Sequence, residues 1–566
     1  MKVMKTLYKL AIVTTLLGVT ACSDKLTDAN IDPNVVDPAT GNPNMIMPTV
    51  LSAAATDYLL KGWNEPAGVV QHIQHDSWNS GINHYDWSAQ DWTNYYGMLR
   101  NNNYLLKSPN AYPFHRGVAL TMKAFVFGMI TDLWGDAPYT DALKGDEGLF
   151  EPVFDTQETI YRGILSDLWT ASDIFATGDN SGYLAGYDVY YAGDPAKWQR
   201  FANSLILRYA MRISEKLPDV AKDNIERVAA SGVYIKTPAD DAVITYVGTQ
   251  TSNAWPIEAP WTGDSPFSNF RRRKPGQKLI DQMLSTQDPR LAVWWSPVQV
   301  QWVADPSLDK YMDDAIYRNN QRLSVVTLPD AELQQGIAAG DKFTRRFNPN
   351  RKGANDPELN ANLYVGLPAG LVSPDSHNGN PDPGQDKPNQ HVSLMSHLYR
   401  THSDPDLMKS RIISSAEVSF ILAEAALKGW SVNGSAESHY LDGIRNSLIT
   451  WKQEDAYGEF VARDGIAFNS ANALQQIITQ KWIASWTGAV EAWMDFRRTG
   501  WPDLKAGPAS PQPVLPLRFI YGSAEQLANP TNIEEAITRL EQNQYSNQPN
   551  SQWSKPWVVQ GTGKPW

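Results

Sequence analysis

The chain has 566 residues, a formal charge of −12, one cysteine and 21 tryptophans. So acidic a chain repels phosphate backbones, which argues against nucleic-acid binding, and a single cysteine excludes an intramolecular disulfide. The length suits one large domain or about two to four ordinary ones, with enough apolar content for a core.

Residues 1–21 have the composition of a secretory signal. Lysines precede a mostly apolar run over residues 10–19, which is too short to span a membrane. Residues 19–22, Val-Thr-Ala-Cys, resemble a bacterial lipoprotein box. That resemblance implies that Cys22 is acylated and anchors the mature chain to a membrane by lipid. The alternative is a cysteine that lies near an ordinary cleavage site.

Residues 22–47 are polar and rich in Asp-Pro and Asn-Pro turns, so we expect a flexible tether. The next part, residues 48–231, has helical periodicity. Ile160, Ile164 and Leu168 form one apolar stripe, and Phe201, Leu205, Tyr209 and Ile213 form another. Short connections between such helices predict stacked helix hairpins rather than a sheet.

Residues 232–405 differ in composition. The segment 235–246 is a plausible strand region, and the rest is loops rich in proline, glycine and aromatic residues. Long irregular segments in a compact protein are usually functional or disordered, and the aromatic content argues against disorder.

Helical periodicity returns in residues 406–566, which we expect to pack back on the first helical part. Ile412, Ala416, Phe420, Ala423 and Leu427 form one stripe before Gly429, and Leu474, Ile478, Trp482 and Trp486 form the next. A short helix is expected near residues 533–540. The predicted fold class is therefore mainly α, with a large loop-rich portion and a few short strands.

Several blocks, taken together and in order, resemble the SusD/RagB family of nutrient-binding outer-membrane lipoproteins. With the lipoprotein box, the resemblance covers most of residues 22–500. The blocks are Trp134-Gly135-Asp136-Ala137-Pro138-Tyr139, residues 152–158, Lys197-Trp198 with Asn203-Ser204-Leu205, Asp288-Pro289-Arg290-Leu291, residues 416–418 and 423–426, Gln480-Lys481-Trp482, Glu491-Ala492-Trp493 and Arg497-Arg498-Thr499-Gly500.

This resemblance implies a stack of tetratricopeptide-like helix pairs with a variable irregular portion packed on it. It also implies a SusC-type TonB-dependent transporter in the outer membrane as partner, over which the lipoprotein acts as a hinged lid. Family members capture oligosaccharides, or in some cases peptides, and perform no chemistry.

Loop-borne aromatic residues are the candidate ligand contacts, because flat rings stack on the C–H faces of sugars and amides bind the hydroxyls. Two groups stand out in turn-like surroundings. Their members are Trp78, Asn79, Tyr85 and Trp87 in the first group and Trp255 and Trp261 in the second. For any single ring the alternative is a place in the core, which we expect for Trp294 and Trp295.

Structural roles are expected for two other groups of charged residues. Glu417 and Glu424 lie seven residues apart on one helix face, like a glycosidase pair, but their apolar neighbours favour buried ion pairs with Arg497 and Arg498. His72, His75 and Asp76 do not match HExxH, so a helix-end histidine pair is expected rather than a metal site.

No P-loop, dinucleotide fingerprint or nucleophile elbow is present, so no cofactor and no catalytic residue is expected. The resulting hypothesis is a surface lipoprotein that binds an oligosaccharide and delivers it to the transporter. The same role for peptides, a surface glycoside hydrolase and a scaffold for other lipoproteins remain as alternatives.

Overall fold

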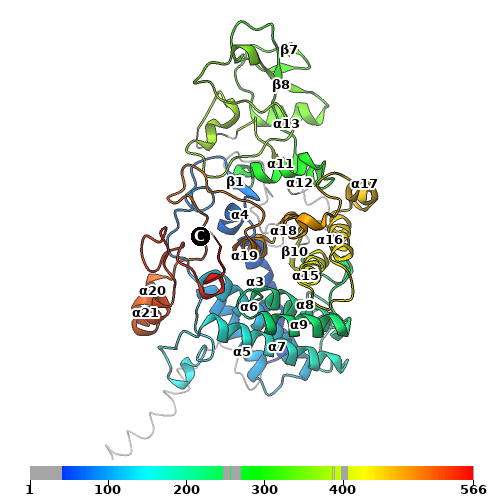
Figure 1. Cartoon of the computed structure of the whole chain (residues 1–566), viewed down its shortest axis with the longest axis vertical. Coiled ribbons are helices and arrows are strands. Elements are labelled where there is room, and N and C mark those ends of the chain that lie inside the picture. The colour runs from blue at the N-terminus through cyan, green and yellow to red at the C-terminus, as the bar shows by residue number, and fades with distance from the viewer. Residues whose placement is uncertain are drawn as a thin grey trace, which may run out of the picture.

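The computed structural model describes residues 41–246, 255, 269–384, 387, 389–396, 399 and 406–564. In this part of the chain the protein is mainly helical: a stack of helix pairs occupies the lower half of Figure 1 and a lobe with short strands lies at the top. This is the mainly α, tetratricopeptide-like architecture with few short strands that the sequence predicted.

The first helical part is a series of helices in which each packs on its neighbours in the sequence, from α5 through α9. The helices are α3 (Pro43–Lys61), α4 (Glu65–Val69), α5 (Thr93–Lys107), α6 (Pro113–Trp134), α7 (Gln157–Ala176), α8 (Pro195–Arg212) and α9 (Pro218–Ser231).

Capping residues and apolar stripes explain where these helices form. Thr156 caps α7 by accepting a hydrogen bond from the Thr159 amide, and the predicted stripe from Ile160 to Leu168 is fully buried. Asp194 caps α8 in the same way. The central helix α6 is long and apolar enough to cross a membrane, but 89% of its most apolar stretch is buried inside the fold, so it is a core helix.

The second helical part packs on the first through α15 against α8 and α19 against α3, α4 and α8. Its helices are α15 (Ser415–Leu427), α16 (Ala436–Thr450), α17 (Tyr457–Val461), α18 (Ala473–Ala484), α19 (Ala489–Thr499), α20 (Ser523–Ala528) and α21 (Pro530–Thr538). Short 3-10 segments lie at η1 (Gly145–Glu147), η2 (Pro238–Asp240), η4 (Pro349–Arg351), η5 (Pro374–Gly379), η6 (Glu454–Ala456), η7 (Ser470–Asn472) and η8 (Trp557–Val559).

Short strands and helices make up the middle of the chain. Antiparallel pairs join β1 to β3, β2 to β10 and β4 to β9, and the upper lobe holds a four-stranded sheet of order β5-β8-β6-β7 in which β5 and β8 run parallel. The elements are β1 (Ile73–His75), β2 (Ala242–Thr245), α10 (Asn269–Arg272), β3 (Arg273–Pro275), α11 (Gln277–Ser285), α12 (Leu291–Trp294), β4 (Trp295–Ser296), β5 (Gln301–Ala304), β6 (Tyr317–Arg318), β7 (Gln321–Arg322), α13 (Asp330–Ala338), β8 (Phe343–Phe347), β9 (Leu394–Met395) and β10 (Lys409–Ile413).

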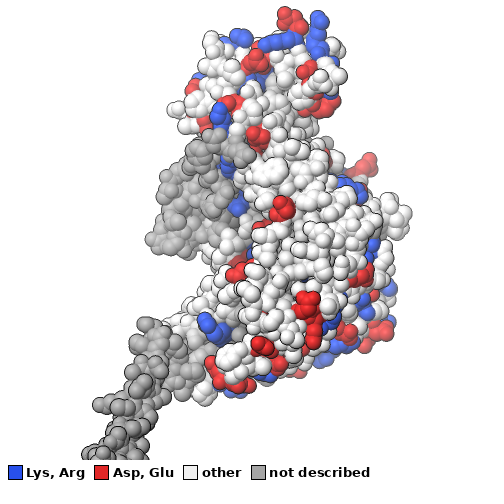
Figure 2. Space-filling view, turned by 90° about the vertical axis from the view of Figure 1, so that its left-hand side faces the viewer, with Lys and Arg blue, Asp and Glu red and all other residues white. Residues whose placement is uncertain are grey.

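Charged side chains are unevenly spread over the surface. On the face in Figure 2 they gather at the tip of the upper lobe and toward the lower end, and the area between carries few.

Some predicted boundaries differ from the structure. Residues 43–47, expected in the tether, are the first residues of α3, because Asn42 accepts a hydrogen bond from the Asn44 amide and starts the helix. Ile412, expected in a helical stripe, lies in β10, where the backbone pairs with β2. In the expected strand region 235–246, only the four residues of β2 form a strand, and the 3-10 turn η2 precedes them.

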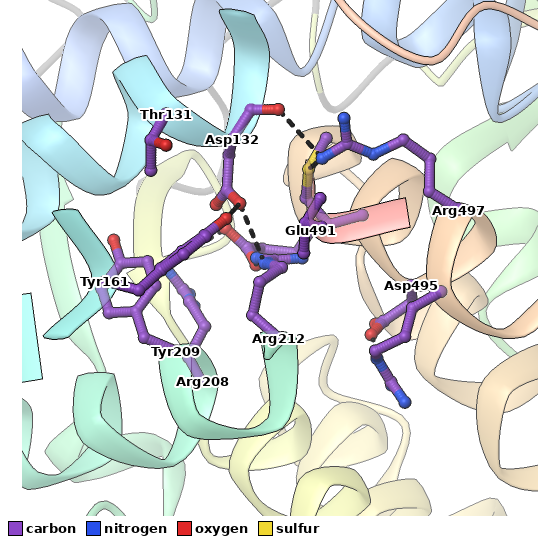
Figure 3. A network of polar contacts seen from close by, with 12 residues as sticks. Thr131, Asp132, Tyr161, Arg208, Tyr209, Arg212, Glu491, Asp495 and Arg497 are labelled. Atoms are coloured by element: carbon purple, nitrogen blue, oxygen red, sulfur yellow. Dashed lines mark hydrogen bonds and ion pairs between the residues drawn. The ribbon is translucent and has the colours of Figure 1, made fainter. Parts of the chain in front are cut away.

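A buried ion network joins the two helical parts (Figure 3). On α8, Arg208 binds Glu417 of α15 through its Nε at 2.7 Å and approaches Glu491 of α19 through its Nη1 at 3.3 Å. Arg212, one turn further, pairs with Glu491 and, through its Nε at 3.1 Å, with Asp132 of α6. Burial by itself would raise the pKa of Glu491, but Arg208 and Arg212 outweigh it and hold that pKa below its usual range.

The network continues along α19. Lys481 of α18 lies 2.7 Å from Asp495, and Arg498 binds both Asp495, at 3.1 Å, and Glu424 of α15. These side chains are all at most 6% exposed, so each charge is compensated within the fold. Buried charges that keep their partners lock helix positions, and removal of one partner leaves an uncompensated charge in the interior.

The first prediction tests this network. Glu491→Gln is expected to lower the free energy of unfolding by about 3–5 kcal/mol, because Arg208 and Arg212 lose their shared carboxylate. Urea unfolding followed by far-UV circular dichroism measures the effect. The matched control is Glu147→Gln in the exposed Lys107–Glu147 pair, which should cost less than about 1 kcal/mol. Equal effects of the two variants would contradict the assigned role.

The second prediction concerns pH. Asp241 is 4% exposed and accepts a hydrogen bond from the Ser415 amide at the start of α15, at 2.7 Å. Burial raises the pKa of Asp241 from 3.8 to about 7. The folded state therefore holds this proton more tightly than the unfolded state, so stability falls as pH rises from about 4 to about 7 and then levels off.

In the Asp241→Asn variant the side chain keeps an oxygen that can accept the hydrogen bond from the Ser415 amide, but the side chain does not titrate. Near pH 8 the variant should be more stable than the wild type by about 4 kcal/mol, and the difference should vanish below about pH 4. Urea unfolding at several pH values measures it. The exposed Asp223→Asn on α9 controls for the loss of one negative charge, and a pH-independent difference would contradict the prediction.

Candidate functional site

The loop that follows β1 is closed by buried polar contacts. Asp76 accepts a hydrogen bond from Arg272 Nε at 2.7 Å and lies 3.5 Å from Lys274 Nζ. Asn83 then folds the loop back: its Oδ1 accepts from the His75 amide at 2.7 Å and its Nδ2 donates to the His75 carbonyl at 2.7 Å. The loop therefore has a fixed shape although it has no regular secondary structure.

Trp78 is the exposed ring of this loop. It is 52% exposed, while its ring packs on the buried imidazole of His84 with 3.9 Å between centroids and a tilt of 33°. His84 Nε2 in turn donates to the Leu371 carbonyl at 3.0 Å. One face of the indole is thus covered and held in place, and the exposed remainder offers a flat apolar surface, as stacking on a sugar ring requires.

Asn79 stands next to this ring. It is half-buried, and its Oδ1 accepts a hydrogen bond from the Ile82 amide at 2.8 Å. The oxygen is therefore occupied by the loop, and the two N–H groups of Nδ2 are the donors that the side chain can offer to a ligand.

Two distant segments complete the surroundings. The Ala509 amide donates to the Gly370 carbonyl at 2.8 Å, and Gly370 has a φ of +59° with Gly507 so close that a Cβ would lie 2.8 Å from its Cα. Val372, just after the carbonyl that binds His84, is 61% exposed. Segment 507–510 therefore packs on residues 369–370, and the adjoining Leu371 carbonyl holds His84 against Trp78. Sequence patterns gave no sign of the contribution from Leu371.

Tyr85 and Trp87, predicted as ligand contacts, lie in the core. Tyr85 is fully buried and its hydroxyl donates to the Gly68 carbonyl at 3.2 Å. Trp87 is 6% exposed and packs edge-on against Trp493 and Phe519. Neither ring offers a face to solvent, because both anchor the loop to the helices beneath it.

Trp255 is also buried, at 1% exposure, and stacks on Tyr399 with 5.1 Å between centroids. Trp261 lies outside the described residues. As expected, Trp294 and Trp295 are core residues, and both pack on Trp486. Much of the tryptophan excess thus fills a large aromatic core.

His72, His75 and Asp76 make structural contacts. His72 Nε2 donates to the Trp482 carbonyl at 2.9 Å, and burial lowers the pKa of His72 to about 4, which keeps the ring neutral. The sequence predicted that His75 would lie at a helix end. That prediction is wrong: His75 lies in strand β1, because the backbone here pairs with β3. Among the described residues, no group of three His, Cys, Asp or Glu side chains could hold a metal ion.

Glu417 and Glu424 form the buried ion pairs that were expected, each with its own arginine. Arg208 binds both carboxylate oxygens of Glu417 at 2.7 Å, so this partner is not one of the predicted arginines, and Arg498 binds Glu424. Arg497 instead donates to backbone carbonyls, among them that of Asp132 at 2.9 Å. Both carboxylates are occupied and buried, which does not suit an acid–base pair that must reach a substrate.

Comparison with known proteins agrees with this fold. The SusD-like family model, described as starch-binding and associating with the outer membrane, matches residues 40–314 and 346–522. No curated protein sequence matches the chain.

Solved structures are similar along nearly the whole chain. A chitin-binding protein is 21% identical with a TM-score of 0.67, over 92% of this chain and 100% of its own. A SusD homologue from Bacteroides uniformis is 21% identical with a TM-score of 0.67, over 91% of this chain and 99% of its own. A chitin-binding SusD homologue from Flavobacterium johnsoniae is 20% identical with a TM-score of 0.63, over 91% and 98%.

At these identities the solved structures establish the shared fold alone. The family match covers well over half of the chain. The chain therefore belongs to the SusD-like family, whose members are described as starch-binding and associated with the outer membrane.

Proposed function

We propose that this protein is a cell-surface lipoprotein of the outer membrane that captures an oligosaccharide and delivers it to a SusC-type TonB-dependent transporter. The main support for oligosaccharide binding is the Trp78 ring, which is half exposed and packs on His84. His84 is in turn hydrogen-bonded to the Leu371 carbonyl. Family membership supports the role, and the chitin-binding relatives make chitin-type oligosaccharides reasonable probes.

The contact chemistry follows from the residues of the loop. The exposed indole would stack on the C–H face of a sugar ring, and Asn79 Nδ2 would donate to a hydroxyl beside it. Because His84 and Asn83 already fix the loop, little conformational entropy would be lost on binding. Trp261, which lies outside the described residues, is proposed as a further ligand contact.

The third prediction tests this site. Trp78→Ala should weaken oligosaccharide binding at least about tenfold, corresponding to about 1.4 kcal/mol, because the stacking surface is lost. Isothermal titration calorimetry against chitohexaose and maltoheptaose, with a peptide panel beside them, is the measurement. Phe150→Ala is the matched control, since Phe150 is an aromatic residue 78% exposed on another part of the surface.

Two outcomes would change the assignment. If both variants keep wild-type affinity, Trp78 is not the contact. If peptides bind and no oligosaccharide does, the protein serves peptide uptake, which is the alternative role within the same family.

The fourth prediction concerns the anchor. In the proposed role Cys22 carries only the lipid, so Cys22→Ala protein should bind the same oligosaccharide in solution as the wild type and yet fail to support its uptake by cells. Membrane fractionation and growth on the oligosaccharide measure the second effect. Loss of binding by the purified variant would contradict a purely anchoring role.

A further inference from the structure

A hollow lined by α11, α18 and the loop before α18 shares no residue with the segments around Trp78. Its volume is about 740 Å³, in the range of small-molecule sites. Six of its twelve lining residues carry side-chain amides: Gln282, Asn469, Asn472, Gln475, Gln476 and Gln480. We call it the amide groove.

One set of these amides makes the wall rigid. Gln476 Oε1 accepts a hydrogen bond from the backbone N–H of Asn469 at 2.8 Å, and Gln476 Nε2 donates to the backbone carbonyl of Ala467 at 2.9 Å. Gln480 is buried, and its Oε1 accepts from Arg290 at 3.1 Å. The loop between α17 and α18 is therefore fastened to α18, and the groove exists before any ligand arrives.

A second set is free to bind. In the part of the chain that the structure describes, the side chains of Gln282, Asn472 and Gln475 make no hydrogen bond to the protein, and neither does that of Thr479. All are at least partly exposed and line the same hollow. Each side-chain amide supplies two N–H donors and a carbonyl acceptor. The threonine hydroxyl supplies one donor and can also accept.

The charge of the lining narrows the ligand class. Among the described residues that line the groove there is no lysine, arginine or histidine, and Asp464 is the one ionisable side chain, so an anionic ligand is disfavoured. Phe468, half-buried against Tyr440 with 5.6 Å between centroids, adds an apolar surface. None of the described lining residues belongs to a strand, so they offer an extended peptide no strand edge to pair with.

We infer that the amide groove is a second binding site for a neutral oligosaccharide. Paired donors and acceptors match the hydroxyls of a sugar, and Phe468 matches its C–H face. The inference shares its ligand class with the proposed function but not its residues.

The fifth prediction tests this groove in the Trp78→Ala background. That protein should keep a weak affinity for chitohexaose or maltoheptaose, and adding Gln282→Ala and Gln475→Ala should weaken this residual binding at least about tenfold. Isothermal titration calorimetry measures it. Gln526→Ala, on an exposed glutamine of α20 outside the groove, is the matched control and should leave the affinity unchanged.

The outcomes separate the two sites. If Trp78→Ala abolishes binding and the Gln282→Ala/Gln475→Ala protein binds like the wild type, the groove inference is overturned while the proposed function stands. If Trp78→Ala binds like the wild type and the double variant does not, the groove is the main site. A wild type that binds neither sugar overturns both. Unchanged melting temperatures exclude unfolding as the cause, since Gln282 and Gln475 lie at the surface.

Discussion

The shared contact of Arg208 and Arg212 with Glu491 ties the two helical parts of the chain together. Charges buried this deeply are tolerated only with their partners in place, so α6, α8, α15 and α19 are held in one arrangement. The consequence reaches the proposed ligand-binding surface, because α19 packs on α4, and α4 leads directly into β1 and the Trp78 loop. Trp482 Nε1 also donates to the Val70 carbonyl at 2.8 Å, which joins α18 to the same segment.

The aromatic residues divide between two physical roles. Rings such as Trp63, Trp294 and Trp486 pack edge-on or stacked in the interior, where they supply the apolar area that a protein without disulfides needs. Trp78 differs because only one of its faces is covered, by His84. An exposed ring that the protein itself holds in place is an uncommon use of a large apolar side chain, and it is what stacking on a sugar demands.

The Trp78 loop and the amide groove would bind the same class of ligand by different means. The first relies on a flat ring with one amide beside it, and the second on several amides with one half-buried ring. Neither relies on cations, in keeping with an acidic chain. Two such surfaces on one rigid frame would increase the affinity for a long glycan through effective concentration, provided that the glycan spans both.

The sequence by itself determined the helical class, the positions of α7, α8, α15 and α18, the family and the burial of Glu417 and Glu424, because periodicity, caps and ordered motifs are local properties. It could not separate Trp78 from Tyr85 and Trp87, which share one loop and similar neighbours. Only the tertiary structure decided which of these rings reaches solvent, since Phe519, Trp493 and the Leu371 carbonyl come from segments hundreds of residues away. Eleven of the twelve residues that line the amide groove come from the single stretch 464–480, and only the tertiary structure places Gln282 of α11 beside them.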